Sequence, residues 1–375
     1  MFILMLLTNP FKPDPRVYEE AKTLVNAGYK VTIFCWDREG TYPEKEIIDG
    51  IYVKRIKKHS AYGNPISFLK GIIAFYLRAL ILAKNEKYDI LHAHDFDTLP
   101  LGVLLKKLHN SKLVYDAHDH YSSMIKDVVP EPIPTIVRIL EKILIRYTDG
   151  NIAATKDLGE AIFMPYKYEI IMNAKNLNDF HIPYDEIVNF RQKINPNNKF
   201  LIVYIGILKL WTPLPYIIEA VKRLDNVLLL IGGDGPHKAQ ILEMIKGYKN
   251  IKYIGWVNKN EIPIYTCASD VIILPSNPNK EYTRVAVGNK IMEALAAGKP
   301  IIAGKNTAGE RIVRECNAGL ICEFGDVDCL VEKIKILMEN KDLRERYGKN
   351  ARKCAEEKYN WDIMKERLLR FYRNL

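Results

Sequence analysis

A regular alternation of short apolar runs and helical patterns constrains the fold of this chain more than any other feature. Residues 2–7 form an apolar run, and Asp14-Pro15 then fits a helix N-cap followed by proline at the first helical position. That helix is predicted to reach Ala27 and to end before Gly28. The later strand candidates of this half are "YKVTIFCW", "IYVKRI", "DILHAH", "KLVYDAH", "GNIAAT" and "YEIIMN". Such a rhythm predicts a parallel sheet with helices on both faces.

The rhythm weakens after Asn173 and then starts again. A chain of 375 residues is long enough for two domains. We therefore predict an α/β protein with two doubly wound domains that face a cleft, because ligands bind beyond the carboxyl ends of the strands in such sheets. The expected boundaries are 1–172 for the first domain, 173–197 for a linker, 198–359 for the second domain, and 360–375 for a helix that packs back on the first.

Charge and cysteine content narrow the function classes. The net charge of +10 favours phosphorylated molecules or anionic membranes, whereas the scattered basic residues argue against nucleic acid. Six cysteines without a C-x-x-C pair predict buried free thiols in a reducing, cytoplasmic setting. We expect the opening segment to be a buried strand rather than a signal peptide. The apolar stretch Ile66–Ala83 contains Lys70 and Arg78, so we expect the helical segment Ile66–Asn85 not to span a membrane.

The stretch "VAVGNKIMEALAAGKPIIAG" offers the clearest candidate site. Gly288, Asn289 and Lys290 open a helix, and Asn289 suits its cap. A helix start presents unpaired amides and a positive dipole, so together with Lys290 it suits a diphosphate. Glu293, one turn further on, is placed to bind two ribose hydroxyls, and its alternative role is an interaction with the helix dipole.

Three more loops follow strands of the second half. Their candidate ligand residues are Gly206, where backbone can approach a ligand, Lys209 for a phosphate, Gly233 and Gly235 in an open turn, and Trp256 and Val257 beside a base. Each has a plainer alternative: Lys209 as a solvated loop lysine, and Trp256 as a core residue.

Polar residues also follow the strands of the first half. His92 and His94 share one face of a strand, and His118, Asp119 and His120 follow the next one. His-x-His pairs bind zinc, but no recognisable spacing places further ligands, so we expect no metal. Histidines that cap strand ends are the structural alternative for His92 and His120.

The order of these motifs resembles the retaining nucleotide-sugar glycosyltransferases of family 4. The matching segments are "YIG", "IGGDGP", "YIGWV", "ASDVIILPS", "NKIMEALAAGKPII" and "NAGLICEFGD", preceded by "DPRVYEEAKTLVNAGYKVTIF", "YDILHAHDFDTLPLG" and "KLVYDAHD". The resemblance implies two Rossmann-like domains of the GT-B fold, with the donor in the second. It also implies that Glu293 binds the ribose, that the amides from Gly288 to Ile291 hold the diphosphate, and that Gly206 lies beside the donor phosphates.

The same resemblance places His118 opposite the donor sugar, where a neutral imidazole could hydrogen-bond the sugar or orient the acceptor. The expected acceptor contacts are Asp14, Arg16, Asp95 and Asp119, with helix capping as the alternative for Asp14. Some positions depart from the family. Val285 stands where a second glutamate is usual, and Ile207 and Thr212 stand where an arginine and a lysine are usual, so Lys209 and Lys290 are the nearest replacements.

We therefore expect a retaining, metal-independent glycosyltransferase without a cofactor. It would move a sugar from a nucleotide diphosphate sugar to a glycan or lipid-linked acceptor in polysaccharide biosynthesis, with His118, Lys209 and Lys290 as catalytic residues. The alternatives are a nucleotide-sugar epimerase and a non-catalytic binder. The predicted helix Thr135–Tyr147 carries Arg138, Lys142 and Arg146 beside apolar residues. It suits either a peripheral contact with an anionic membrane or a packed helix with a solvated basic face.

Overall fold

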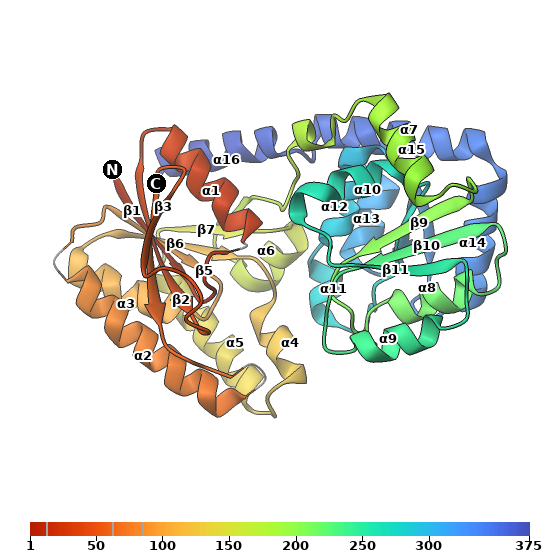
Figure 1. Ribbon diagram of the computed structural model, residues 1–375. Helices are drawn as coiled ribbons and strands as arrows, with labels where there is room; N and C mark the ends of the chain where they lie inside the picture. Colours follow the sequence, from red (N-terminus) through yellow and green to blue (C-terminus); the bar gives the residue numbers. More distant parts are fainter. Residues whose placement is uncertain (13, 62–63, 85) are drawn as a thin grey trace. The chain divides into compact units, whose positions relative to one another are not determined.

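The computed structural model describes residues 1–12, 14–61, 64–84 and 86–375, and it divides into two compact units. Unit 1 comprises residues 1–172 and 364–375, and unit 2 comprises residues 173–363. Both are α/β units built on parallel strands, as the sequence predicted (Figure 1). Asn85, the expected end of the long helix, lies outside the described residues.

Unit 1 is built on an eight-stranded sheet in the order β3-β4-β2-β1-β5-β6-β7-β8. The strands are β1 Phe2–Leu7, β2 Lys30–Asp37, β3 Lys45–Ile48, β4 Ile51–Lys57, β5 Ile90–His94, β6 Lys112–Ala117, β7 Gly150–Ala153 and β8 Glu169–Ile170. All neighbours pair in parallel except β3, which runs antiparallel to β4. The strand order reverses direction between β1 and β5, so the loops after these two strands diverge at the carboxyl edge.

Helices cover this sheet. They are α1 Pro15–Asn26, α2 Pro65–Ala83, α3 Leu99–His109, α4 Tyr121–Met124, α5 Ile133–Leu144, α6 Lys156–Phe163 and α16 Trp361–Arg373, with 3-10 turns at Ile125–Asp127 and Ile145–Tyr147. The predicted cap of α1 is confirmed, because the Asp14 carboxylate accepts a hydrogen bond of 3.1 Å from the Val17 amide. From Met364 on, α16 belongs to unit 1, where the Tyr372 hydroxyl and His92 Nδ1 are 2.7 Å apart.

Among the described residues, one helix, α2, is long and apolar enough to cross a membrane by length and composition. One side of α2 packs on the sheet, because Trp36 contacts Phe68 and Phe75 at ring-centroid distances of 5.6 and 6.2 Å. Gly71 allows this contact, since a Cβ there would lie 2.2 Å from the Trp36 ring. The helix is therefore a layer of the fold with one apolar side left exposed.

Unit 2 contains two three-stranded parallel sheets, β11-β10-β9 and β12-β13-β14. The strands are β9 Phe200–Ile205, β10 Val227–Gly232, β11 Ile251–Gly255, β12 Ile272–Leu274, β13 Ile301–Gly304 and β14 Gly319–Cys322. A parallel bridge between Ile202 and Val271 joins β9 to the start of the β12 segment. The joined order is that of a doubly wound nucleotide-binding sheet, and it reverses direction between β9 and β12.

The helices of unit 2 include one in the expected linker. They are α7 Tyr184–Ile194, α8 Leu214–Val221, α9 Lys238–Ile245, α10 Ile262–Ala268, α11 Glu281–Val285, α12 Asn289–Ala297, α13 Ala308–Glu315, α14 Val327–Glu339 and α15 Lys341–Glu357, with 3-10 turns at Leu177–Phe180 and Lys259–Glu261. Residues 173–197 are thus part of unit 2. Helix α7 is held there because Ile187, Phe190 and Ile194 pack on the core beside β9 and β10.

Disulfides correct the expectation of free thiols. Cys316 bonds to Cys354, which joins the end of α13 to α15, and Cys322 bonds to Cys329, which joins β14 to α14. Cys35 and Cys267 are buried free thiols, as expected. The expectation was wrong for the four others because the pairs are 38 and 7 residues apart, and only tertiary packing brings them together.

The two disulfides should contribute unequally to stability. In the variant Cys316→Ser/Cys354→Ser we expect the free energy of unfolding to fall by about 4 kcal/mol, because the bond closes a long loop in the unfolded chain. In Cys322→Ser/Cys329→Ser the loss should be smaller, because its loop is short. Urea unfolding under oxidising conditions measures both. With a reductant present, the wild type should become no more stable than the variants. If the wild type and both variants were equally stable without reductant, the two disulfides would be contradicted.

Candidate functional site

The start of α12 lies at the reversal point of unit 2. Gly288 is the N-cap in extended conformation, and α12 runs from Asn289 to Ala297. The sequence predicted Asn289 as the cap; that detail was wrong, because Asn289 is the first helical residue and its Oδ1 accepts a 3.2 Å hydrogen bond from Lys175 Nζ. The Ile291 amide donates to the Gly288 carbonyl at 3.0 Å, so of the expected amides this one is already engaged.

Lys290 and the end of β9 meet at this point. A Cβ at Gly206 would lie 2.6 Å from Lys290 Nζ, so glycine leaves the room that the ammonium occupies. Lys290 Nζ also lies 4.5 Å from the centroid of the Tyr204 ring. A lysine charge and the positive end of a helix are thus concentrated beside the strand-end glycine, which is an arrangement suited to a diphosphate.

The glycines after β10 serve the packing of the loops. Gly233 has φ +120°, and a Cβ there would lie 2.1 Å from the Gly206 carbonyl oxygen. Gly235 lies against the backbone of Leu208, and a Cβ at Gly235 would lie 2.5 Å from the Leu208 carbonyl oxygen. Both glycines therefore allow the loops after β9 and β10 to approach backbone to backbone.

The remaining predicted donor residues differ in exposure. Trp256 follows β11 and is 69% exposed, which excludes the core placement, whereas Val257 is buried. Lys209 Nζ lies 5.4 Å from the Trp211 ring centroid, and it is Lys290 rather than Lys209 that lies over Gly206. Glu293 is one turn inside α12, and its Oε1 lies 3.4 Å from Lys175 Nζ. Sequence reasoning missed Lys175, because no motif or spacing links it to α12.

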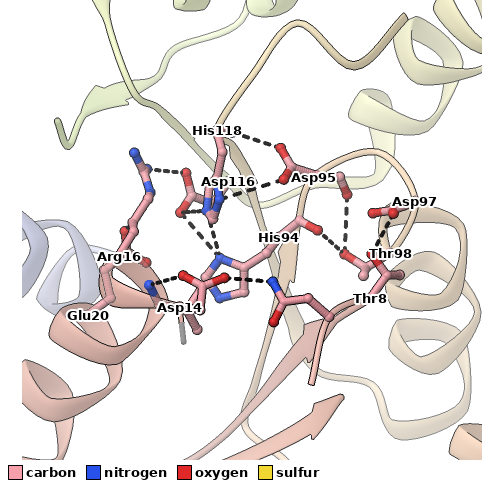
Figure 2. A network of polar contacts seen from close by, with 12 residues as sticks. Thr8, Asp14, Arg16, Glu20, His94, Asp95, Asp97, Thr98, Asp116 and His118 are labelled. Carbon is pink, nitrogen blue, oxygen red and sulfur yellow. Dashed lines mark hydrogen bonds and ion pairs between the residues drawn. The ribbon is translucent and has the colours of Figure 1, made fainter. Parts of the chain in front are cut away.

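Asp116, at the end of β6, is the centre of a buried polar network in unit 1 (Figure 2). One oxygen accepts a 2.6 Å hydrogen bond from Arg16, and the other lies 3.1 Å from His118 Nε2. His94 Nδ1 and His92 Nε2 lie 3.5 and 3.6 Å from that second oxygen. Burial alone would raise the pKa of Asp116, but Arg16 and His118 hold it well below its usual range.

Helix α1 supplies the positive charge of this network. Arg16 and Glu20 are both buried, and Arg16 Nε lies 3.1 Å from Glu20 Oε1. They stand on the same face of α1 as Val17, Ala21 and Leu24, which are fully buried. Charged residues on the apolar face of a helix were therefore the signal that could have revealed Glu20. The structure places Arg16, expected at the acceptor, as the internal partner of two carboxyl groups.

His118 is held by Asp95, which follows β5 in left-handed conformation (φ +62°). One Asp95 oxygen accepts the His118 amide at 2.9 Å, and the other lies 3.6 Å from His118 Nδ1. Burial and Arg16 lower the pKa of His118, but Asp95 and Asp116 outweigh them and raise it to about 9. The sequence predicted a neutral imidazole, whereas the two carboxyl groups that face the ring favour its protonated form.

The other two predicted acceptor residues lie near this network. Both oxygens of Asp14 are engaged, one by the Val17 amide and one by the Asn9 side chain at 2.7 Å. Asp119 is half-buried directly after His118, and burial raises the pKa of its carboxyl group. Among the described residues, the Asp119 carboxylate forms no hydrogen bond or salt bridge, in contrast to the carboxylates of Asp14 and Asp95.

Four buried side chains of the network could also coordinate a metal ion. Glu20, His92, His94 and Asp116 offer ligand atoms that all lie within 4.8 Å of one another. The Arg16 guanidinium, however, is already paired with both carboxyl groups of this set. It supplies the charge that an ion would bring, so we interpret the cluster as an ion network centred on Arg16.

The protonation of His118 can be measured directly. In an NMR titration of the ring we expect a midpoint near pH 9. Because this pKa lies above the ordinary value of 6.5, protonation of His118 stabilises the fold fully below about pH 6.5, and this contribution is lost as the pH rises through about 9. In Asp95→Asn the midpoint should fall toward the ordinary value. A wild-type midpoint near 6.5, or no change in the variant, would contradict the assignment.

Comparisons with known proteins identify the family. The model for "Glycosyl transferases group 1" matches residues 185–354, and the model for "Glycosyltransferase Family 4" matches residues 16–167. An uncharacterized glycosyltransferase of Methanocaldococcus jannaschii is 23% identical over 367 residues, which is 94% of this chain and 92% of that protein. The UDP-Gal:alpha-D-GlcNAc-diphosphoundecaprenol alpha-1,3-galactosyltransferase of Escherichia coli is 25% identical over 299 residues, 74% of this chain and 72% of that one.

Solved structures share the fold along the whole chain. Sucrose-phosphate synthase from Thermosynechococcus elongatus has a TM-score of 0.82 at 17% identity, covering 100% of this chain and 99% of that one. HepE of Anabaena, crystallised with UDP-glucose, has a TM-score of 0.76 at 18% identity, covering 100% of both chains. These likenesses confirm the GT-B type of α/β fold that was expected from the sequence. This chain belongs to the group 1 glycosyltransferases, within glycosyltransferase family 4.

Proposed function

We propose that this glycosyltransferase moves a sugar from a nucleotide diphosphate sugar to a hydroxyl acceptor with retention of configuration. The observation that carries the proposal is the position of Lys290, whose ammonium lies over Gly206 at the start of α12. This point is the reversal of strand order in unit 2, which is where doubly wound sheets bind nucleotides.

Each part of the donor finds suitable chemistry near this point. The diphosphate would take the amides of Asn289 and Lys290 together with the Lys290 ammonium. Glu293 would accept hydrogen bonds from the ribose hydroxyls, and the exposed ring of Trp256 offers a surface for the base. The crystal of HepE with UDP-glucose supports a nucleotide-sugar donor for a chain of this fold.

The transfer step then depends on stabilising the leaving group. The bond between the anomeric carbon and the diphosphate oxygen breaks, the acceptor oxygen forms the new bond, and its proton passes to the departing diphosphate. Lys290 and the helix start, joined by Lys209 from the loop after β9, would stabilise the developing negative charge. In the proposal these groups replace a metal ion, and no cofactor takes part.

His118 has a different part in this scheme. A group whose pKa is about 9 is protonated at neutral pH, so it is a poor general base there. We assign it to donate a hydrogen bond to a sugar oxygen. Asp119 beside it would accept a hydroxyl of the acceptor.

A glycan or lipid-linked acceptor, within polysaccharide biosynthesis, completes the proposal. The Escherichia coli relative is named for a diphosphoundecaprenol-linked substrate, and an Acholeplasma laidlawii relative, 24% identical over 311 residues, is an alpha-monoglucosyldiacylglycerol synthase. An enzyme that takes a lipid-linked acceptor has to work at a membrane surface.

The outer helices of unit 1 offer a surface for that contact. Helix α3 contacts both α2 and α5, so the three form one layer. The exposed large apolar side chains of this layer are Ile66, Leu69, Ile73, Leu77 and Ile81 on α2, Leu104 and Leu108 on α3, and Ile133, Ile136, Ile139, Leu140 and Ile143 on α5. Exposed Arg78, Lys107, Arg138 and Lys142 stand among them. Apolar side chains with basic neighbours suit the surface of an anionic bilayer.

We further propose that the enzyme works in the cytoplasm, on the inner face of that membrane. Disulfides are rare in a reducing cytoplasm. Reduced Cys316 and Cys354 in cells would therefore support this location, whereas a Cys316–Cys354 disulfide in cells would contradict it.

The first test identifies the donor and then removes the Lys290 side chain. Panels of UDP-, GDP-, ADP- and dTDP-sugars in a thermal-shift assay should identify the donor as the compound that stabilises the wild type.

With that donor, Lys290→Ala should lower kcat/KM by about 100-fold or more, because the negative charge on the leaving diphosphate loses its cation. Lys341→Ala, an exposed lysine of the same unit, is the matched control and should retain activity. Undiminished turnover in Lys290→Ala would remove the diphosphate assignment.

The same assay separates the finer parts of the proposal. Turnover should persist with EDTA, and NMR of the product should show the anomeric configuration of the donor. Product should form only when an acceptor is added, whereas an epimerase would convert the donor alone. Inversion, or loss of activity with EDTA, would overturn the corresponding part.

The membrane contact is tested by flotation on lipid vesicles. The wild type should float with phosphatidylglycerol vesicles at low salt and less at high salt, because salt screens the attraction between the basic residues and the anionic lipid. Ile136→Gln/Ile139→Gln should lose most of the floating fraction, whereas Ile47→Gln, an exposed isoleucine on β3, should not. Absence of the wild type from the floated fraction at low salt would reject a membrane contact.

A further inference from the structure

Lys175 approaches the start of α12 from a distant part of the sequence. Its Nζ donates a 3.2 Å hydrogen bond to Asn289 Oδ1 and lies 3.4 Å from Glu293 Oε1. The Lys175 and Glu293 side chains are 22% and 15% exposed, so this pair is largely withdrawn from water. Neither the family motifs nor the donor residues expected from the sequence include Lys175.

This position is unfavourable for a lysine that serves only stability. Cations destabilise the N-terminus of a helix, because they face its positive end. Glu293 lies one turn inside α12, beyond the first turn in which the helix dipole favours a carboxylate. The chain nevertheless brings two lysines, Lys175 and Lys290, to the same helix start. Such an excess of positive charge is balanced once an anion binds there.

The backbone of Lys175 is fixed by the C-terminal part of unit 2. Its carbonyl accepts a 3.0 Å hydrogen bond from the Trp361 amide, and it forms a bridge with Asn360. Asn360 is buried, and its side chain donates to the carbonyls of Ala355 and Glu356 at 2.9 Å. Lys175 therefore starts from an anchored backbone, which reduces the entropy lost when its side chain is held at α12.

The negative charge of Glu293 would repel a bound diphosphate, and Lys175 can offset this repulsion. A carboxylate that binds the ribose stands close to the diphosphate, and two negative groups in a partly buried site repel one another. An ammonium at 3.4 Å cancels that repulsion and also holds the carboxylate in one orientation.

We propose that Lys175 is a positioning residue of the donor site, which neutralises and orients Glu293 so that the start of α12 accepts a nucleoside diphosphate. This inference rests on the proposed function, because it assumes that a donor diphosphate binds at α12. Lys175 thus restores part of the positive charge that Ile207 and Thr212 do not provide.

Calorimetric titration with UDP, GDP, ADP and dTDP tests the inference in the full chain. The nucleotide that binds the wild type most tightly is then used for every variant. Lys175→Met should weaken its binding about tenfold or more, because an unpaired Glu293 then faces the diphosphate. Lys175→Arg should restore binding to within about threefold, since the charge returns. Lys353→Met removes the lysine of a Lys–Glu pair elsewhere in unit 2 and is the matched control.

A double-mutant cycle distinguishes positioning from direct contact. In a Glu293→Gln background no carboxylate needs neutralising, so Lys175→Met should then change affinity by less than about threefold. An equal loss in both backgrounds would overturn the positioning role in favour of a direct phosphate contact. Unchanged affinity in Lys175→Met alone would overturn the inference altogether.

Two controls keep the outcomes separate. Thermal unfolding without nucleotide checks that each variant folds, and Lys175→Gln replaces Lys175→Met if the latter does not. If no nucleotide binds the wild type, the proposed function fails and the inference fails with it. If the wild type binds and the variants do not differ from it, only the role of Lys175 is rejected.

Discussion

Two reversals of strand order decide where this protein presents its chemistry. In unit 1 the order changes direction between β1 and β5, and in unit 2 between β9 and β12. Parallel strands need crossover helices, and those helices begin at the carboxyl edge where the strands end. Strand-end glycines, polar loop residues and helix N-termini are therefore collected at the same two places. Lys290 meets Gly206 at one of them, and His118 meets Asp95 at the other.

The two units balance their charges in opposite ways. Unit 1 buries its carboxyl groups beside Arg16 and a protonated His118, and Asp116 at the centre is paired with both. Unit 2 instead gathers Lys175 and Lys290 at the positive end of α12. One carboxylate, Glu293, offsets them only in part. Unit 1 therefore holds its opposite charges within one buried network, whereas unit 2 gathers positive charge at a helix start, where an anion would be favoured.

Much of the proposed donor site could be placed on its strands and helices from the sequence, because it consists of local signals. Gly206 follows β9, and Gly288 and Lys290 lie at the start of α12 with Glu293 one turn further in, on the elements that the sequence predicted. The cap of α12 was misassigned, since the Asn289 side chain is engaged by Lys175 rather than by its own helix. The charge state of His118 was also missed. It depends on Asp95 and Asp116, which come from two neighbouring strands and face one ring.

The sequence by itself determined the alternation of strands and helices, the two-part organisation, and which polar residues stand at strand ends, because hydrophobic periodicity and turn chemistry act over short stretches of chain. Tertiary structure alone decided the pairings. Lys175 reaches Asn289 across 114 residues, Arg16 reaches Asp116 across 100, and Cys316 bonds to Cys354 across 38. The physical reason is that charge pairing and disulfide formation depend on distance in space, and only the packing of the core fixes that distance.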